Sequence, residues 1–155
     1  MFFEYPTGGV EVDDSASFLT GTDASSWATL VEHCEVRRLR TGECVIAVGD
    51  DERSLLIVTD GMLEASIPRG RRSRVRTIGR FGPGSVVGEL SFLDGRPRSA
   101  NVLALGDAEV LRLTFQSFET LAARHASLAR SMLLDLGRIA AGRVRQLNRQ
   151  VEQLA

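Results

Sequence analysis

The chain has 155 residues, of which 43% are hydrophobic and 25% charged, and its formal net charge is −1. This length and composition fit one globular domain with a moderate core and exclude wholesale disorder. A total charge this close to zero does not favour a nucleic-acid binder, because such proteins usually carry a basic excess.

The N-terminus carries no recognisable export signal. It lacks the basic start and the long apolar run of a signal peptide. No stretch of the sequence reaches the ~20 apolar residues that a membrane-spanning helix needs. We therefore expect a cytoplasmic protein without a membrane span.

The N-terminal region, residues 1–34, is predicted to be a lead-in with short helices. Residues 1–24 are rich in Gly, Thr, Ser and Asp, and a short helix is expected near Ala16–Thr20. Ser25 is expected to cap the next helix, because its hydroxyl can accept a hydrogen bond from a backbone N–H of the first turn.

The two cysteines, Cys34 and Cys44, are expected on neighbouring strands. A disulfide between them is not favoured, because nothing else in the chain looks secreted. The two histidines, His33 and His125, complete no group of four ligands with a recognisable spacing, so no metal site is predicted.

A β-rich region begins near Glu35, where short runs of strand-forming residues alternate with glycine turns. This rhythm predicts a sandwich or barrel of β-strands. The pair Asp60-Gly61 predicts a tight hairpin between two of the runs. The expected strands are Cys44–Val48, Leu55–Val58, Met62–Ile67, Val75–Ile78, Asn101–Leu105 and Glu109–Leu113.

A strongly basic run occupies Arg69–Arg74 and continues at Arg76 and Arg80. It could meet an acidic protein, nucleic acid or an anionic membrane surface. More often such a run is a solvated hairpin whose charges protect an edge strand from unwanted pairing. We adopt the second interpretation and keep the first as the alternative.

Residues 81–100 contain the groups best suited to bind a ligand. Glycine and proline impose turns before Val86, and Gly88–Leu93 is expected to form one short helical turn. Backbone N–H groups at a helix start can bind an anion, and the Arg98 guanidinium is a planar, charged fork suited to phosphate. Because Glu89 can accept a hydrogen bond from a sugar hydroxyl, one site could hold phosphate and ribose together. Alternatively, Glu89 and Arg98 form only an internal salt bridge.

The hydrophobic period becomes helical after Thr114. The apolar face of a first helix consists of Phe115, Phe118, Leu121 and Ala122. A longer helix is expected from about Ala126 to Gln153. Its heptad seam consists of Leu133, Ala140, Leu147 and Leu154 at one position and Gly137, Val144 and Val151 at the other. β-Branched residues and leucines in this arrangement favour a parallel two-stranded coiled coil.

This seam has two interpretations. It could cover the β-region of its own subunit. Because Val144–Leu154 should extend beyond that region, we predict instead that the helix forms a homodimer.

The sequence Gly88-Glu89-Leu90-Ser91, followed by Arg96-Pro97-Arg98-Ser99-Ala100, closely resembles the phosphate-binding cassette of cyclic nucleotide-binding domains. That family includes the bacterial catabolite activator protein and the regulatory subunits of cAMP-dependent protein kinase. The resemblance extends roughly from Val36 to Arg149. It implies a mainly β fold with flanking helices (α+β), built around a jelly-roll barrel, or double-stranded β-helix.

The resemblance also implies how the chain is organised. The β-roll would occupy residues 35–114, with the phosphate-binding cassette at 81–100. The helices of residues 115–155 would form a lid over the ligand and a possible dimer interface.

The resemblance implies a role for each residue of the cassette. Glu89 would accept a hydrogen bond from the ribose 2′-hydroxyl, and Arg98 would bind the phosphate together with the Ser99 hydroxyl. The backbone N–H groups of Leu90 and Ser91 would complete the phosphate cradle. Other residues expected beside the ligand are Gly88 and Ala100, and, near the base, Ile78, Val86 and Val87. Ordinary core packing is an equally good explanation of the last three.

The long helix departs from the family pattern at the base. The catabolite activator protein supplies threonine and serine hydroxyls to adenine there, whereas Arg143 and Val144 occupy those positions here. Arg143 could stack on the base or point to solvent. Serine at position 99 favours cAMP, since family members that prefer cGMP often carry threonine at this position. We therefore expect cAMP as the regulatory ligand, with cGMP as the alternative and no metal.

The predicted function is that of a non-enzymatic cyclic-nucleotide sensor. No helix-turn-helix segment follows the long helix before Ala155, so we expect a separate protein effector and no sequence-specific DNA binding. No nucleophile–base pair or metal cluster indicates an enzyme. The alternatives are a scaffold domain that binds no nucleotide and a DNA-binding regulator that uses the arginine-rich run.

Overall fold

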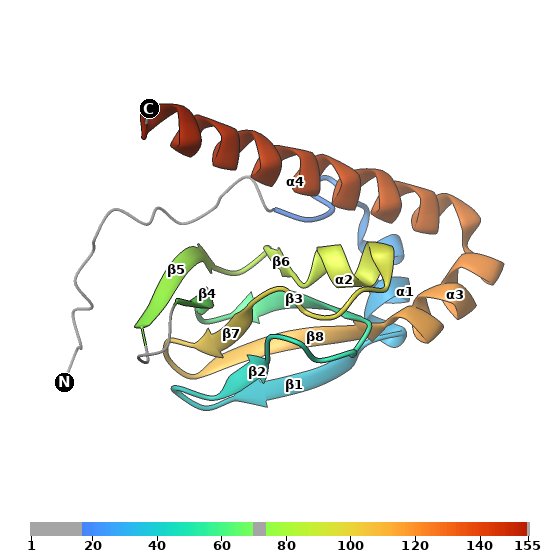
Figure 1. Cartoon of the computed structure of the whole chain (residues 1–155). Coiled ribbons are helices and arrows are strands. Elements are labelled where there is room, and N and C mark those ends of the chain that lie inside the picture. The colour runs from blue at the N-terminus through green and yellow to red at the C-terminus, as the bar shows by residue number, and fades with distance from the viewer. Residues whose placement is uncertain (1–16, 70–73, 155) are drawn as a thin grey trace.

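The computed structural model describes residues 17–69 and 74–154. Two four-stranded antiparallel sheets form a roll, two short helices lie at one end of it, and a long helix runs along one side (Figure 1). The strand orders are β1-β8-β3-β6 and β2-β7-β4-β5. The predicted jelly-roll barrel with flanking helices is confirmed.

The elements agree with most of the sequence predictions to within three residues. In chain order they are α1 (Ala24–Glu32), β1 (Glu35–Leu39), β2 (Cys44–Ile46), β3 (Ser54–Asp60), β4 (Leu63–Arg69), β5 (Arg74–Phe81), β6 (Val86–Val87), α2 (Glu89–Asp94), β7 (Asn101–Ala104), β8 (Ala108–Thr114), α3 (Phe115–Arg124) and α4 (Ala126–Gln153). The strands β1 and β6 were not among the predicted runs.

The strand β3 is the centre of the core. It pairs with β8 on one side and β6 on the other, and it contacts α2. Its residues from Ser54 to Val58 are all buried, which indicates that both faces of the strand are covered. Burial of this apolar run therefore fixes the position of the segment from β6 to α2.

An aromatic cluster joins α2 to α3. The Phe92 ring is fully buried and makes edge-on contacts with the rings of Phe115 and Phe118, at centroid distances of 5.5 and 5.4 Å. The Arg53 guanidinium lies 3.5 Å from the centre of the Phe115 ring, and its Nε donates to the Phe92 carbonyl at 3.0 Å. The short helix α2 is thus held in place by residues outside the cassette.

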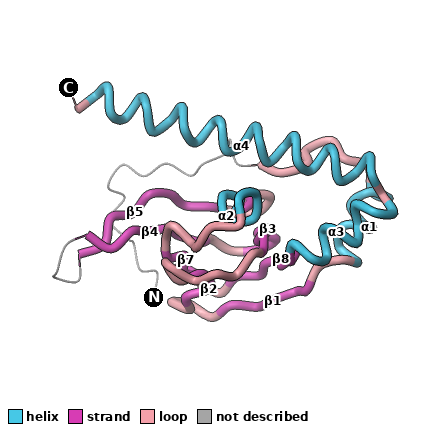
Figure 2. Tube along the Cα trace, turned by 45° about the vertical axis from the view of Figure 1, so that its right-hand side comes forward, coloured by secondary structure: helices cyan, strands magenta, loops and turns pink. Residues whose placement is uncertain are grey.

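The long helix α4 buries one face against the rest of the domain and leaves the predicted seam exposed. The buried residues of α4 are Ala129, Met132, Leu136 and Ile139. Both views place the helix above α2 (Figures 1 and 2). Leu147 is 57% exposed and Leu154 80%, so the seam does not cover the β-roll of its own chain. None of the helices in the described part of the chain is both long and apolar enough to cross a bilayer.

The short helix expected near Ala16–Thr20 is wrong for residues 17–20, and Ala16 lies outside the described residues. Ser17 instead forms an isolated β-bridge with Ser85. The backbone N–H of Leu19 donates to Asp135 Oδ2 of α4 at 2.6 Å. Long-range partners therefore replace the local hydrogen bonds that a helix would need.

The predicted cap of α1, Ser25, is also wrong. Asp23 caps the helix, because its Oδ1 accepts a hydrogen bond from the backbone N–H of Ser26 at 2.7 Å. Ser25 lies inside the first turn. Asp and Ser are comparable caps, so propensity alone does not decide between neighbouring candidates.

The cysteines do not lie on neighbouring strands. Cys34 precedes β1, whereas Cys44 lies on β2 of the other sheet, and both are free thiols. Burial raises the pKa of the Cys34 thiol to about 12. This thiol therefore stays protonated and weakly reactive at neutral pH.

The predicted hairpin at Asp60-Gly61 is wrong. The strands on either side of it, β3 and β4, belong to different sheets. Gly61 has a φ of 81°, and a Cβ there would lie 2.6 Å from the Asp107 carbonyl oxygen. The glycine therefore makes a tight corner between sheets, where another segment of backbone approaches closely.

This corner predicts an asymmetry between two glycines with the same backbone geometry. Gly42 has a φ of 82° but open space around its Cβ position. Gly42→Ala should lower the free energy of unfolding by ~1–2 kcal/mol, the cost of a left-handed residue. Gly61→Ala should lower the free energy of unfolding by ~2–5 kcal/mol, because the new Cβ also clashes with the Asp107 carbonyl oxygen. Equal losses for the two variants in urea unfolding would contradict the close approach at Gly61.

Candidate functional site

The start of α2 is shaped by Gly88. This residue has a φ of 84° and precedes the first residue of the helix. A Cβ at this position would lie 2.6 Å from Nη1 of Arg98 and 3.2 Å from the Ser54 carbonyl oxygen. Glycine is therefore needed here both for the backbone conformation and for the close approach of the Arg98 guanidinium.

Arg98 is buried and firmly anchored, with only 4% of its surface exposed. Its Nη2 donates to the carbonyl and hydroxyl oxygens of Ser54 at 2.8 and 2.9 Å, and its Nη1 donates to the Gly88 carbonyl at 3.1 Å. The Arg98 backbone also exchanges hydrogen bonds with Gly49 and Asp50, both of 2.8 Å. These contacts fix the guanidinium beside the start of α2.

Charged neighbours surround Arg98. Burial lowers the pKa of Arg98, although the carboxylates of Glu52, Asp50 and Glu89 oppose this effect. Burial also acts to raise the pKa of Glu52, but the hydrogen bond and charge of Arg112, with smaller contributions from Ser54 and Arg98, lower it overall. The Arg112 Nε lies 2.5 Å from Glu52 Oε1. An arginine remains charged after such a shift, so the site keeps its positive group.

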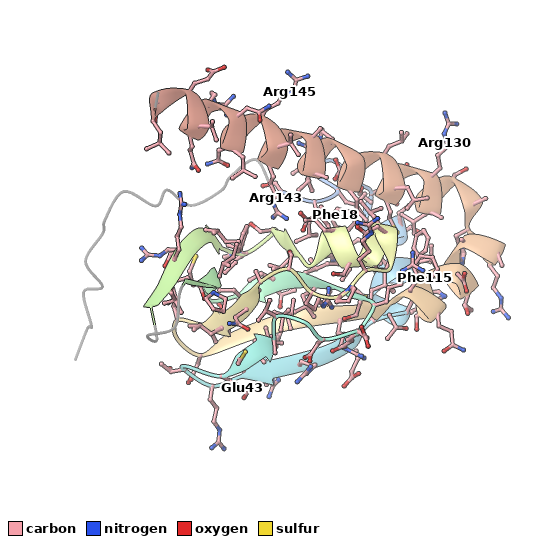
Figure 3. All side chains as sticks on the ribbon, viewed as in Figure 1. Phe18, Glu43, Phe115, Arg130, Arg143 and Arg145 are labelled. Carbon is pink, nitrogen blue, oxygen red and sulfur yellow. The ribbon has the colours of Figure 1, made fainter. Side chains whose placement is uncertain are left out.

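Glu89, the first residue of α2, is buried with 4% of its surface exposed. Its Oε2 forms an ion pair with Nη1 of Arg143 from α4. The Nη2 of Arg143 donates to the Val86 carbonyl at 2.7 Å, and the guanidinium lies 4.8 Å from the centre of the Phe81 ring. Arg143 therefore points toward the roll rather than to solvent, as Figure 3 shows.

These partners do not match the alternative of a simple Glu89–Arg98 salt bridge. Glu89 is paired with Arg143, whereas Arg98 donates to Ser54 and Gly88. Two separate polar groups thus lie at the start of α2, one acidic and one basic. Such a pair can serve a sugar hydroxyl and a phosphate independently.

The remaining predicted site residues lie around these two groups, with one exception. Val86, Val87 and Ser91 are buried, Ala100 is half-buried, and Leu90 and Ser99 are exposed. The backbone N–H groups of Leu90 and Ser91 precede the first helical hydrogen bond of α2, which Phe92 donates to Gly88 at 3.2 Å. Ile78 is the exception: it is 47% exposed and lies at the irregularity in the pairing of β5 with β4, between Thr77 and Gly79.

Several contacts of the site were not predicted by the sequence analysis, although Phe81 belongs to the predicted cassette. Ser54 and Glu52 support Arg98 from a segment more than 40 residues earlier in the chain, and Phe81 lies beneath Arg143. No local pattern marks these three residues, because each contributes through a contact made by the fold.

A cavity lies apart from the cassette. Its volume is about 580 Å³, it is lined by residues 19–23, Ser26 and the first half of α4, and no cassette residue lines it. Within the described ranges, no three His, Cys, Asp or Glu side chains gather in a way that could hold a metal ion.

The lowered pKa of Glu52 predicts a specific loss of stability in acid. The folded state binds this proton more weakly than the unfolded chain does. The resulting stability is present above the ordinary pKa of 4.5 and is lost as the pH falls through the lower folded-state value. In urea unfolding between pH 7 and pH 3, Glu52→Gln should therefore lose less stability than the original protein.

The exposed Glu119 on α3 provides the control for this measurement. Glu119→Gln should keep the acid dependence of the original protein. If Glu52→Gln also keeps it, the charged contacts of Glu52 do not contribute to folding.

Comparisons with known proteins identify the family of the chain. A family model described as the cyclic nucleotide-binding domain matches residues 36–125. Glutaminase 2 of Bradyrhizobium diazoefficiens is 31% identical over 139 residues, which are 90% of this chain but 21% of that protein. The chain therefore spans about a fifth of that relative.

Two solved structures share the fold. The catabolite activator protein of Thermus thermophilus superimposes with a TM-score of 0.74 and 26% identity, over 87% of this chain and 61% of that one. A cyclic nucleotide-binding domain from Methylobacillus flagellatus gives a TM-score of 0.77 and 21% identity, over 91% and 80% of the two chains. Since the family model matches more than half of the chain, the protein belongs to the cyclic nucleotide-binding domain family.

Proposed function

We propose that the protein is a regulatory cyclic-nucleotide sensor that binds its ligand at the start of α2. The observation that carries this proposal is the buried Arg98 guanidinium, held beside the first turn of α2 by Ser54 and Gly88. The guanidinium has five N–H donors, and its three hydrogen bonds leave capacity for a phosphate. Glu89 supplies the acceptor for the ribose 2′-hydroxyl.

We propose cAMP as the ligand, with cGMP as the alternative. This choice rests on Ser99, an exposed serine directly after the phosphate arginine, in a position where cGMP-binding relatives often carry threonine. Both nucleotides offer the same ribose and phosphate to Glu89 and Arg98. Glu89 and Arg98 therefore do not discriminate between them.

We propose a regulatory rather than an enzymatic role. Glutaminase 2 is an enzyme by name, but the chain spans only 21% of it. The matched segment is the cyclic nucleotide-binding domain, so the activity in that name is not carried over. A scaffold domain that binds no nucleotide is the second candidate. The buried Arg98 and Glu89 argue against it, because removing two charged groups from water costs free energy, and a domain without a ligand would gain no binding function in return.

We propose that α4 passes the signal to a protein effector and forms a homodimer. The seam on its C-terminal half is exposed, and Arg143 connects the same helix to the cassette. Sequence-specific DNA binding is not part of this proposal. The arginine-rich run joins β4 and β5, which pair antiparallel up to Arg69 and Arg74, and β5 is the edge strand of its sheet, so the predicted edge hairpin is confirmed. Residues 70–73 lie outside the described residues, and the protective role of the charges stays a prediction.

The phosphate role is tested with Arg98→Ala. This variant should bind cAMP and cGMP more weakly by ~2–4 kcal/mol, the scale of a truncated buried charge pair. Calorimetric titration measures the loss, and Arg96→Ala is the matched control, because Arg96 lies two residues away and is exposed. Unchanged affinity in a variant with an intact thermal transition would remove Arg98 from the site.

The dimer is tested on α4. Leu147→Glu should weaken self-association at least about tenfold, because it removes the burial of one large apolar side chain, worth ~1.5–3 kcal/mol. Nucleotide affinity per protomer should change little. Sedimentation analysis measures the first effect. Gln153→Glu adds the same charge to α4 outside the seam and serves as control; equal effects of the two variants would argue against the seam.

A further inference from the structure

We propose that Arg143 competes with the ribose 2′-hydroxyl for Glu89, so that the sugar is recognised by exchange of an ion-pair partner. This inference rests on the proposed function and concerns the regulation of that same site. Arg143 is a positioning residue here, because it acts on the ligand through Glu89.

The first step is that Glu89 already has a charged partner within the chain. Its carboxylate is almost fully buried, and the side chain of Arg143 is only 19% exposed. Ion pairs excluded from water in this way are strongly coupled, and removing one partner leaves a costly unpaired charge. The ion pair is therefore a contact that an incoming ligand has to replace or share.

The second step is the chemistry of the sugar hydroxyl. To bind Glu89, the 2′-hydroxyl must donate a hydrogen bond to a carboxylate oxygen. Arg143 donates to Oε2 of the same carboxylate. Arg143 also has a second anchor, the Val86 carbonyl at 2.7 Å. It can therefore release Glu89 without losing its whole attachment to the cassette.

The third step connects the sugar to α4. Arg143 lies on α4 directly before Val144, which belongs to the exposed seam. A ligand with a 2′-hydroxyl weakens the ion pair with Glu89, which is one of the contacts by which Arg143 ties the helix to the cassette. A 2′-deoxy ligand leaves this ion pair in place. The two ligands should therefore affect the middle of α4 differently, although they differ by one oxygen atom.

The test is a calorimetric comparison of cAMP with 2′-deoxy-cAMP. In the original protein, a ligand without the 2′-hydroxyl leaves Glu89 paired with Arg143, so the loss of affinity is limited. In Arg143→Met the same ligand leaves a buried carboxylate without a partner. The affinity ratio of cAMP to 2′-deoxy-cAMP should therefore be at least about tenfold larger in Arg143→Met than in the original protein.

Two further variants complete the design. Arg145→Met is the matched control, because Arg145 lies on the same helix but points away from the roll (Figure 3), and its ratio should equal that of the original protein. Arg143→Lys keeps a positive charge and should return the ratio toward the original value. It also keeps the test valid if Arg143→Met shows no cooperative thermal transition.

Amide exchange gives a second readout. Exchange rates across residues 140–146 should differ between the cAMP and 2′-deoxy-cAMP complexes of the original protein, because only cAMP weakens the ion pair of Arg143 with Glu89. In Arg143→Met, which lacks this ion pair, the rates of the two complexes should coincide. We expect a clear difference in the original protein and none in Arg143→Met.

The outcomes separate the two proposals. If the original protein binds cAMP but the affinity ratio is unchanged or smaller in Arg143→Met, the competition is overturned while the nucleotide site stands. If the original protein binds neither cAMP nor cGMP, the proposed function itself fails. In that event the sugar-dependent role of Arg143 fails with it.

Discussion

The buried guanidinium of Arg98 imposes the constraint on which the cassette depends. A charged group that has left water needs acceptors at fixed positions, and Ser54 and Gly88 provide them. This arrangement requires glycine at position 88, because a Cβ would lie 2.6 Å from the guanidinium. The backbone of Arg98 is held equally by Gly49 and Asp50. Arg98 therefore ties the start of α2 to the segment around the start of β3, and α2 begins where the positive charge is fixed.

The same constraint reaches the helices at the end of the roll. The aromatic contacts of Phe92 with Phe115 and Phe118 link α2 to α3, and Arg53 reinforces this link by stacking on Phe115 and donating to the Phe92 carbonyl. The contact of Arg143 with Glu89 links α2 to α4 on the other side. A displacement of α2 would therefore change its contacts with both α3 and α4. This is the physical basis for expecting that occupancy of the cassette changes the position of α4.

The features that follow from local chemistry could be predicted from the sequence. Strong helical periodicity gave bounds for α4 that coincide with Ala126–Gln153, and the turn residues around Gly88 placed α2 correctly. The corner at Asp60-Gly61 was misassigned, because a turn sequence does not tell whether the strands beside it enter one sheet or two. The supports of Arg98 and the partner of Glu89 could not be predicted either. They come from positions 44 residues before Arg98 and 54 residues after Glu89, and only the folded chain brings them together.

The location of ligand binding tests the account most directly. In a titration of isotope-labelled protein with cAMP, followed by amide chemical shifts, the largest changes should occur at Leu90, Ser91 and Ala100, around the start of α2 and directly after Arg98. Smaller changes should follow in the middle of α4. If cAMP instead shifts the amides of residues 19–23 and Ser26, which line the separate cavity beside α4, or shifts none at millimolar concentration, the cassette is not the nucleotide site.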